Sequence, residues 1–155
     1  MKVEQLYTKC LSEAAYYIES NGEVAIVDPL RDIDAYIKMA KDNNATIKYI
    51  FETHFHADFV SGHLDLARKT GATIVYGPYA DASFDFHKAF DGEIFKIGDI
   101  SLELLSGKSE NNEKKKILYN LKNQKVDIVF GTHAIFQKKV IFKKLGLIVI
   151  DEQHK

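Results

Sequence analysis

The residues best suited to chemistry are two histidines and an aspartate that follow one apolar segment. His54, His56 and Asp58 stand two positions apart, directly after the segment 46–53. In extended backbone, side chains two positions apart point to the same side, so the three can approach one point. Imidazole nitrogens and carboxylate oxygens are ligands for zinc and iron. The pattern therefore predicts a metal site formed by His54, His56 and Asp58, with Asp58 as the candidate catalytic group.

The alternative is that these residues are ordinary polar groups of a surface loop. The coincidence of three ligand types at the end of one predicted strand favours the metal site. Two further imidazoles, those of His63 and His87, are expected in surface or packing roles.

The elements that must position this loop have the apolar patterns of an α/β protein, since the spacing of apolar residues alternates between two and about 3.6. Ser61 and Gly71 are expected to cap the two ends of one helix. The largely apolar segment 126–130, which contains Asp127, and the apolar run 147–150 are typical of strands buried on both faces of a parallel sheet. Strands are predicted over 3–7, 14–19, 23–28, 46–53, 73–76, 93–97, 100–105, 126–130 and 147–150. Helices are predicted over 32–42, 61–70 and up to about 122, with short helices inside 79–92 and near 134–138.

Residues 1–105 resemble the metallo-β-lactamase superfamily through the HxHxD motif. The runs DPLRD (28–32) and ETHFHADFVSGH (52–63) are similar to its persulfide dioxygenase branch, which includes enzymes fused to rhodanese domains. The resemblance implies a mixed sheet with covering helices and oxidation of glutathione persulfide to sulfite at Fe(II). It also implies His54 as a direct ligand, His56 and Asp58 as ligands or supports, and Asp28 as a support of the loop. Other members of the superfamily use Zn(II) for hydrolysis.

The ligand set of this resemblance is incomplete. Phe59 stands where the superfamily motif has its last histidine, and after residue 105 the next histidine is His133. A catalytic metal site usually has three protein ligands and one open position. We therefore expect Fe(II) or Zn(II) to bind weakly or not at all, and any activity to be impaired.

Residues 104–155 resemble a fragment of the RecG-type ATP-dependent DNA helicases. The similarity lies in KVDIVFGTHA (125–134) and LGLIVIDEQH (145–154). It implies that Asp151 and Glu152 are the remnant of a DExH box, which in a complete ATPase holds Mg²⁺ and orients the attacking water. A phosphate-binding loop would need glycine where Leu102 stands, so a backbone cradle for phosphates is not expected. The lysines of this segment are expected to form a solvated face, and nucleic acid is not an expected partner.

The charge distribution also divides the chain near residue 106. Residues 1–106 hold 10 lysines and arginines against 17 aspartates and glutamates, whereas residues 107–155 hold 11 against 5. The sequence therefore indicates a chimera, with a metallo-β-lactamase-like half over 1–105 and a Rossmann-like β-α-β helicase fragment over 106–155, packed into one core. The alternatives to a metal-dependent protein are a folded chimera without native activity and a weak DNA- or nucleotide-binding fragment.

Composition limits the remaining possibilities. A chain of 155 residues with 46% hydrophobic residues is expected to form about one globular domain. Its single cysteine, Cys10, excludes an internal disulfide and a zinc ribbon. No apolar stretch approaches the ~20 residues of a membrane span, so we expect a cytoplasmic protein without a membrane partner. A small thiol or persulfide is the expected substrate if the protein is active, and a homodimer is the oligomeric state considered.

Overall fold

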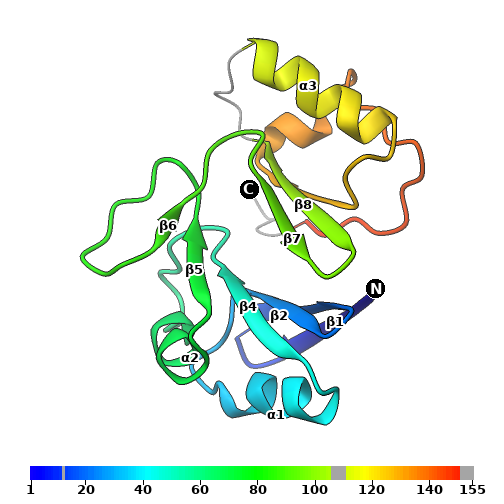
Figure 1. Ribbon diagram of the computed structural model, residues 1–155. Helices are drawn as coiled ribbons and strands as arrows, with labels where there is room; N and C mark the ends of the chain where they lie inside the picture. The colour runs from blue at the N-terminus through cyan, green and yellow to red at the C-terminus, as the bar shows by residue number, and fades with distance from the viewer. Residues whose placement is uncertain (12, 106–110, 151–155) are drawn as a thin grey trace.

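The chain alternates strands and helices along most of its length (Figure 1). The computed structural model describes residues 1–11, 13–105 and 111–150. The strands are β1 (Lys2–Thr8), β2 (Glu13–Ser20), β3 (Glu23–Val27), β4 (Thr46–Phe51), β5 (Thr73–Tyr76), β6 (His87–Lys88), β7 (Ile94–Ile97), β8 (Ile100–Leu105) and β9 (Ile128–Gly131). The helices are α1 (Asp34–Asp42), α2 (His63–Thr70), α3 (Asn111–Lys122) and the short 3₁₀ helix η1 (His133–Phe136).

Within the described residues the strands form two sheets, with the orders β1-β2-β3-β4-β5-β6 and β7-β8-β9. The predicted hairpin of β2 and β3 is confirmed, and its turn places both Asn21 and Gly22 at positive φ. β3, β4 and β5 run parallel, connected through α1 and α2. The carboxyl ends of these three strands therefore meet at one edge of the sheet, which is where the histidine loop begins.

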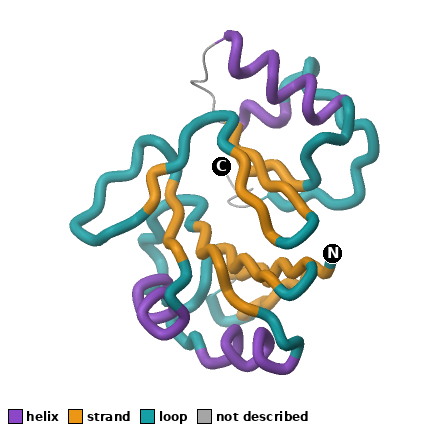
Figure 2. The backbone as a smooth tube through the Cα atoms, in the orientation of Figure 1, coloured by secondary structure: helices purple, strands orange, loops and turns teal. Residues whose placement is uncertain are grey.

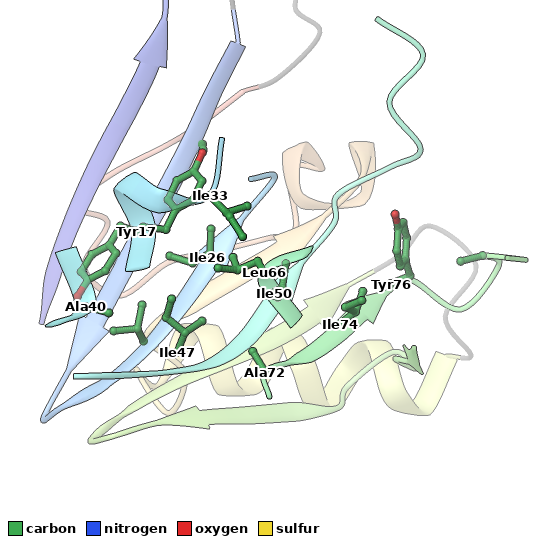
Figure 3. Close-up of a cluster of buried hydrophobic side chains, with 14 residues drawn as sticks. Tyr17, Ile26, Ile33, Ala40, Ile47, Ile50, Leu66, Ala72, Ile74 and Tyr76 are labelled. Carbon is green, nitrogen blue, oxygen red and sulfur yellow. The ribbon is translucent and has the colours of Figure 1, made fainter. Parts of the chain in front are cut away.

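Alternation of side chains along the strands creates two apolar layers. On one face of the larger sheet, Ile26 and Ile50 pack with Leu66 of α2 (Figure 3). On the opposite face, Val27 and Phe51 pack against residues of β7 and β8. Helices α1 and α2 thus cover one face of the larger sheet, and the smaller sheet covers the other (Figure 1).

The segment after residue 110 folds onto the β7–β8 hairpin. β9 pairs in parallel with β8, and α3 packs on the outer face of this smaller sheet. The contact is made by Leu105, Ile117, Leu121 and Ala134, which are all buried. Asn120 of α3 donates a hydrogen bond to the buried Glu103 carboxylate at 3.2 Å. The fold therefore has four layers, helices–sheet–sheet–helix, which confirms the predicted α/β class.

The predicted strand over Leu147–Ile150 is wrong. The structure has loop over 141–150 (Figure 2), and Leu147 is 64% exposed. An apolar run becomes a buried strand only where a neighbouring strand can pair with it, and within the described residues β9 is the last strand of its sheet. β9 itself is only half-buried, so the expectation of burial on both faces also fails.

The short helix predicted within 79–92 is also wrong. Phe84 and Phe86 lie in irregular backbone and pack against the core, and the following residues form β6, which pairs with β5. Tertiary contacts here override a weak local pattern. Asp151 and Glu152 lie outside the described residues. None of the helices in the described ranges is long and apolar enough to cross a membrane.

Candidate metal centre

Asp28 connects the ends of two neighbouring parallel strands. It follows β3 with φ +49° and its N–H donates to the carbonyl of Phe51 at 2.9 Å. Aspartate is among the residues that tolerate this left-handed conformation. Its Oδ1 accepts from the Thr53 N–H at 2.8 Å, and its Oδ2 accepts from the Thr53 hydroxyl at 2.7 Å. Asp28 therefore supports the start of the histidine loop, as predicted.

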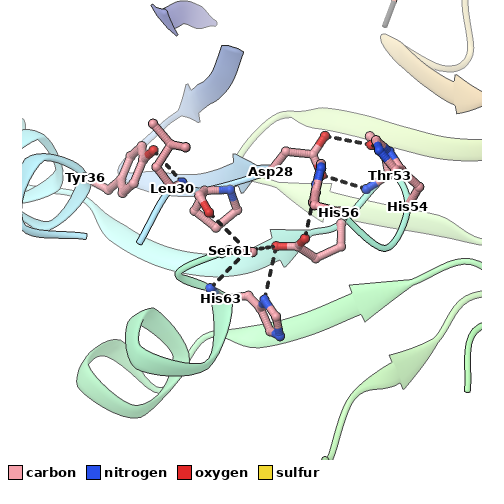
Figure 4. A network of polar contacts seen from close by, with 10 residues as sticks. Asp28, Leu30, Tyr36, Thr53, His54, His56, Ser61 and His63 are labelled. Carbon is pink, nitrogen blue, oxygen red and sulfur yellow. Dashed lines mark hydrogen bonds and ion pairs between the residues drawn. The ribbon is translucent and has the colours of Figure 1, made fainter. Parts of the chain in front are cut away.

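His56 turns inward from this loop toward two carboxylates (Figure 4). Its Nε2 lies 3.1 Å from Oδ1 of Asp28 and 3.5 Å from Oε2 of Glu52. The side chains of His56, Asp28 and Glu52 are 3%, 6% and 0% exposed. One ligand atom of each lies within 4.8 Å of the other two. The structure thus places one predicted residue, His56, in a buried cluster with two acids.

Glu52 is held through one of its two oxygens. The Ser61 hydroxyl donates to Oε1 at 2.6 Å, and the N–H of His63 donates to that hydroxyl oxygen at 3.3 Å. Oε2 has no hydrogen-bond partner among the described residues. Burial raises the pKa of Glu52 to about 8; the hydrogen bond from Ser61 opposes this rise, and the Asp28 carboxylate adds to it.

His54 lies beside His56, with 4.2 Å between the ring centroids. The Thr53 hydroxyl uses its hydrogen to donate to Asp28. Its oxygen lies 2.9 Å from Nδ1 of His54 and must therefore accept a hydrogen bond from that nitrogen. The hydrogen-bond network therefore assigns the proton of neutral His54 to Nδ1 and the lone pair to Nε2. That tautomer can bind a metal through Nε2.

Asp58 lies on the same loop but is exposed and is not part of the buried cluster. Phe59, which replaces the motif's last histidine, places its ring 4.2 Å from the His56 ring. The loop thus brings His54 and His56 together while leaving Asp58 at the surface.

Both additional histidines have packing or surface contacts. The His63 ring packs against Phe84, with 5.0 Å between centroids, and its Nδ1 lies 3.5 Å from Oε1 of Glu52. Burial lowers the pKa of His63, so its ring is neutral at pH 7. His87 is paired with Glu93 at 2.7 Å.

Sequence reasoning overlooked Glu52 as a site residue. It is the residue directly after the apolar strand β4 and precedes His56 by four positions. A carboxylate at the end of a buried strand beside the motif was the available signal, because such groups are seldom fully buried without a partner.

Comparison with known proteins identifies a family. The family model of the metallo-beta-lactamase superfamily matches residues 8–134. A metallo-beta-lactamase from Staphylococcus aureus is 37% identical, with a TM-score of 0.59 over 66% of this chain and 33% of that chain. ETHE1 from Myxococcus xanthus is 26% identical, with a TM-score of 0.59 over 65% of this chain and 46% of that chain.

Curated relatives add a second similarity. The ATP-dependent DNA helicase RecG of Thermotoga maritima is 48% identical over 63 residues, which are 41% of this chain and 8% of that protein. RecG of Aquifex aeolicus is 26% identical over 98% of this chain and 19% of that protein. The chain therefore spans less than a fifth of the length of these relatives.

Proposed function

Because the chain belongs to the metallo-beta-lactamase superfamily, we propose that it is a metal-binding protein of the persulfide dioxygenase type. The observation that carries this proposal is the pair of adjacent rings, His54 and His56, at the carboxyl end of a parallel strand and above two buried carboxylates. In open α/β sheets this edge is the usual position of a binding site.

The donor set suits the metals that we propose. Imidazole nitrogen and carboxylate oxygen are ligands for both Zn(II) and Fe(II). The orphaned buried oxygen of Glu52 also fits a site for a cation. His54, His56 and the carboxylates around them would hold the metal. Asp58, which the motif also predicts as a ligand, is exposed on the same loop. Bound Fe(II) would supply redox chemistry and open positions for a persulfide and O₂.

The persulfide assignment is supported by sequence and shape together. The runs 28–32 and 52–63 resemble the persulfide dioxygenase branch, and ETHE1 of Myxococcus xanthus shares the fold at 26% identity. We expect activity to be impaired, since Phe59 packs on His56 at the position of the motif's last histidine. A small thiol carrier is the proposed substrate, and the cytoplasm the proposed location.

The test is oxygen consumption with glutathione persulfide by protein loaded anaerobically with Fe(II). We expect slow uptake with sulfite as the product, and loss of both on His54→Ala. The matched control is His87→Ala, because His87 is paired with Glu93 outside the buried cluster. Oxygen uptake that His54→Ala leaves unchanged, or no uptake at any iron loading, would contradict the proposal.

The similarity to RecG supports a second candidate, a folded chimera in which residues 106–155 derive from a helicase. The chain is 48% identical to RecG of Thermotoga maritima over 63 residues, and the sign of the net charge reverses near the proposed boundary. On this account the segment contributes packing, through β9 and α3, and at most weak nucleic-acid binding. Anisotropy of fluorescent branched DNA at 20 and 200 mM salt tests that binding. Affinity that falls steeply with salt supports a DNA contact, and no binding at 20 mM salt excludes one.

A further inference from the structure

We propose that a second copy of this chain covers the apolar run 147–150, by accepting that run as an added strand on the free edge of its own β9. Each copy offers one run and one free edge, so reciprocal addition closes after two chains and gives a symmetric dimer. This inference goes beyond the proposed function, and no part of it depends on a bound metal.

The apolar run 147–150 is loop in the single chain (Figure 2), and between 48% and 64% of each of its four residues is exposed. It consists of one leucine, one valine and two isoleucines. An uninterrupted run of such residues suits a strand with apolar neighbours on both faces. Contiguous exposed apolar surface marks an interaction site. The run is therefore available as a strand for a partner.

The free edge of β9 is the uncharged one among the outer strands of the described sheets, which are β1, β6, β7 and β9. β1, β6 and β7 each contain a lysine, and charged side chains protect a strand edge against pairing. β9 has the sequence IVFG, without any charge, and within the described residues it pairs with β8 alone. An added strand therefore meets no electrostatic barrier at β9.

Both faces of β9 belong to apolar layers that an added strand would extend. Phe130 stacks on Phe51 of the larger sheet, with 5.2 Å between the ring centroids. Val129 points the other way and packs in the layer beneath α3. The three apolar residues of β9 are only partly buried, which leaves room for contacts on their outer side. Since alternate side chains of a strand point to opposite faces, the run would contribute apolar side chains to both layers.

Charge complementarity identifies the partner as a second copy. Residues 111–150 hold nine lysines against two acidic residues, whereas residues 1–105 hold 10 basic against 17 acidic residues. The ion pairs between described residues all lie within 1–105, so none of them neutralises a lysine of 111–150. A second copy supplies an acidic half for these lysines and receives the same contact in return. Opposite net charges on the two parts of one chain thus favour its association with itself.

The run must become ordered when it pairs, and this cost limits the affinity. We expect a dissociation constant of roughly 10–100 µM, so the chain is monomeric at a few micromolar. Circular dichroism at a few micromolar therefore reports on the single chain. Because exposed charges contribute to association, the dimer is expected to weaken with salt.

Sedimentation equilibrium of the full chain at 2 and 200 µM tests the proposal. We compare the wild type with Ile148→Lys in the run and with the matched control Val60→Lys, whose valine is 63% exposed outside the run and β9. In 50 mM salt we expect a monomer at 2 µM and mostly dimer at 200 µM for the wild type and the control, and at least about tenfold weaker association for Ile148→Lys. Equal circular dichroism spectra at 2 µM would show that all three chains fold. A monomeric wild type at 200 µM, or a dimer that Ile148→Lys leaves unchanged, would overturn the proposal.

Hydrogen exchange and salt locate the contact. Amide exchange within 128–131 and 147–150 is expected to be slower at 200 µM than at 2 µM, because both segments gain strand hydrogen bonds in the dimer. Exchange within 128–131 that is the same at both concentrations would refute pairing at β9, and equal protection of both segments in a monomer would mean that the run pairs within its own chain. A dimer that is as stable in 500 mM as in 50 mM salt would refute the charge complementarity that selects a second copy.

Discussion

Replacing Ile117 with alanine tests whether α3 is part of the cooperative fold. Ile117 is 0% exposed and packs with Leu105 of β8, on the side of the smaller sheet that faces α3. The substitution removes three carbon atoms, each worth about 0.8 kcal/mol of transfer free energy. The cavity left behind adds to the resulting ~2.4 kcal/mol, so we expect the free energy of unfolding to fall by about 3–4 kcal/mol.

The matched control is the same substitution at Ile148, which is 57% exposed. We expect Ile148→Ala to change the free energy of unfolding by less than about 0.5 kcal/mol. Urea unfolding followed by circular dichroism measures both variants, and limited proteolysis reports whether the region after residue 110 opens first. Equal, negligible effects of the two substitutions would refute the packing of α3 onto the smaller sheet. A large effect of Ile148→Ala would show that the exposed terminal loop is buried in solution.

Two further substitutions test polar contacts. Burial raises the pKa of Glu103, more than the hydrogen bond from Asn120 lowers it. The unfolded chain therefore loses this proton at a lower pH than the folded one, and wild-type stability falls as pH rises through that range. The variant Glu103→Gln keeps an acceptor for Asn120 and is expected to have a higher melting temperature than the wild type at pH 8. This difference in melting temperature is expected to shrink toward pH 4. A difference that thermal melts show to be the same at both pH values would contradict the burial of a titrating carboxyl. Thr53→Val removes the hydroxyl that donates to Asp28 at 2.7 Å. We expect it to lower the free energy of unfolding in urea by about 1.5–3 kcal/mol. A decrease below about 0.5 kcal/mol would mean that this hydrogen bond is not formed.

Much of the larger sheet is predictable because its sequence signals are local. The turn at Asn21 and Gly22 specifies the β2–β3 hairpin, and apolar runs separated by amphipathic stretches specify parallel strands with intervening helices. Gly71, predicted as a helix C-cap, has φ +74° and ends α2. These signals act over a few residues, so they survive without knowledge of the tertiary structure.

Whether the apolar run 147–150 forms a strand depends on residues that are distant in the sequence. Both 126–130 and 147–150 are rich in β-branched and other apolar residues, but of the two a strand forms only near the first, where it can pair with the edge of β8. Sequence periodicity describes a segment and contains no information about which edge is available to it.

Of the residues that the motif proposed for the site, His56 lies in the buried cluster with Asp28 and Glu52. The strand end and the histidine pair could be read from the motif, since the period of a strand fixes their common direction. The position of Glu52 after an apolar strand was a signal, but its closeness to Asp28 was not predictable, because it arises from the parallel pairing of β3 and β4. Asp58 shares the spacing of the motif, yet the loop turns and leaves it exposed.

The central claim is that a divalent cation binds where β3 and β4 end. Its most direct test is an anomalous difference map at the zinc edge, from crystals of the full chain grown with Zn(II). We predict one peak per chain, within bonding distance of the rings of His54 and His56. Diffraction without any such peak, or with zinc bound only at exposed residues, would contradict the claim.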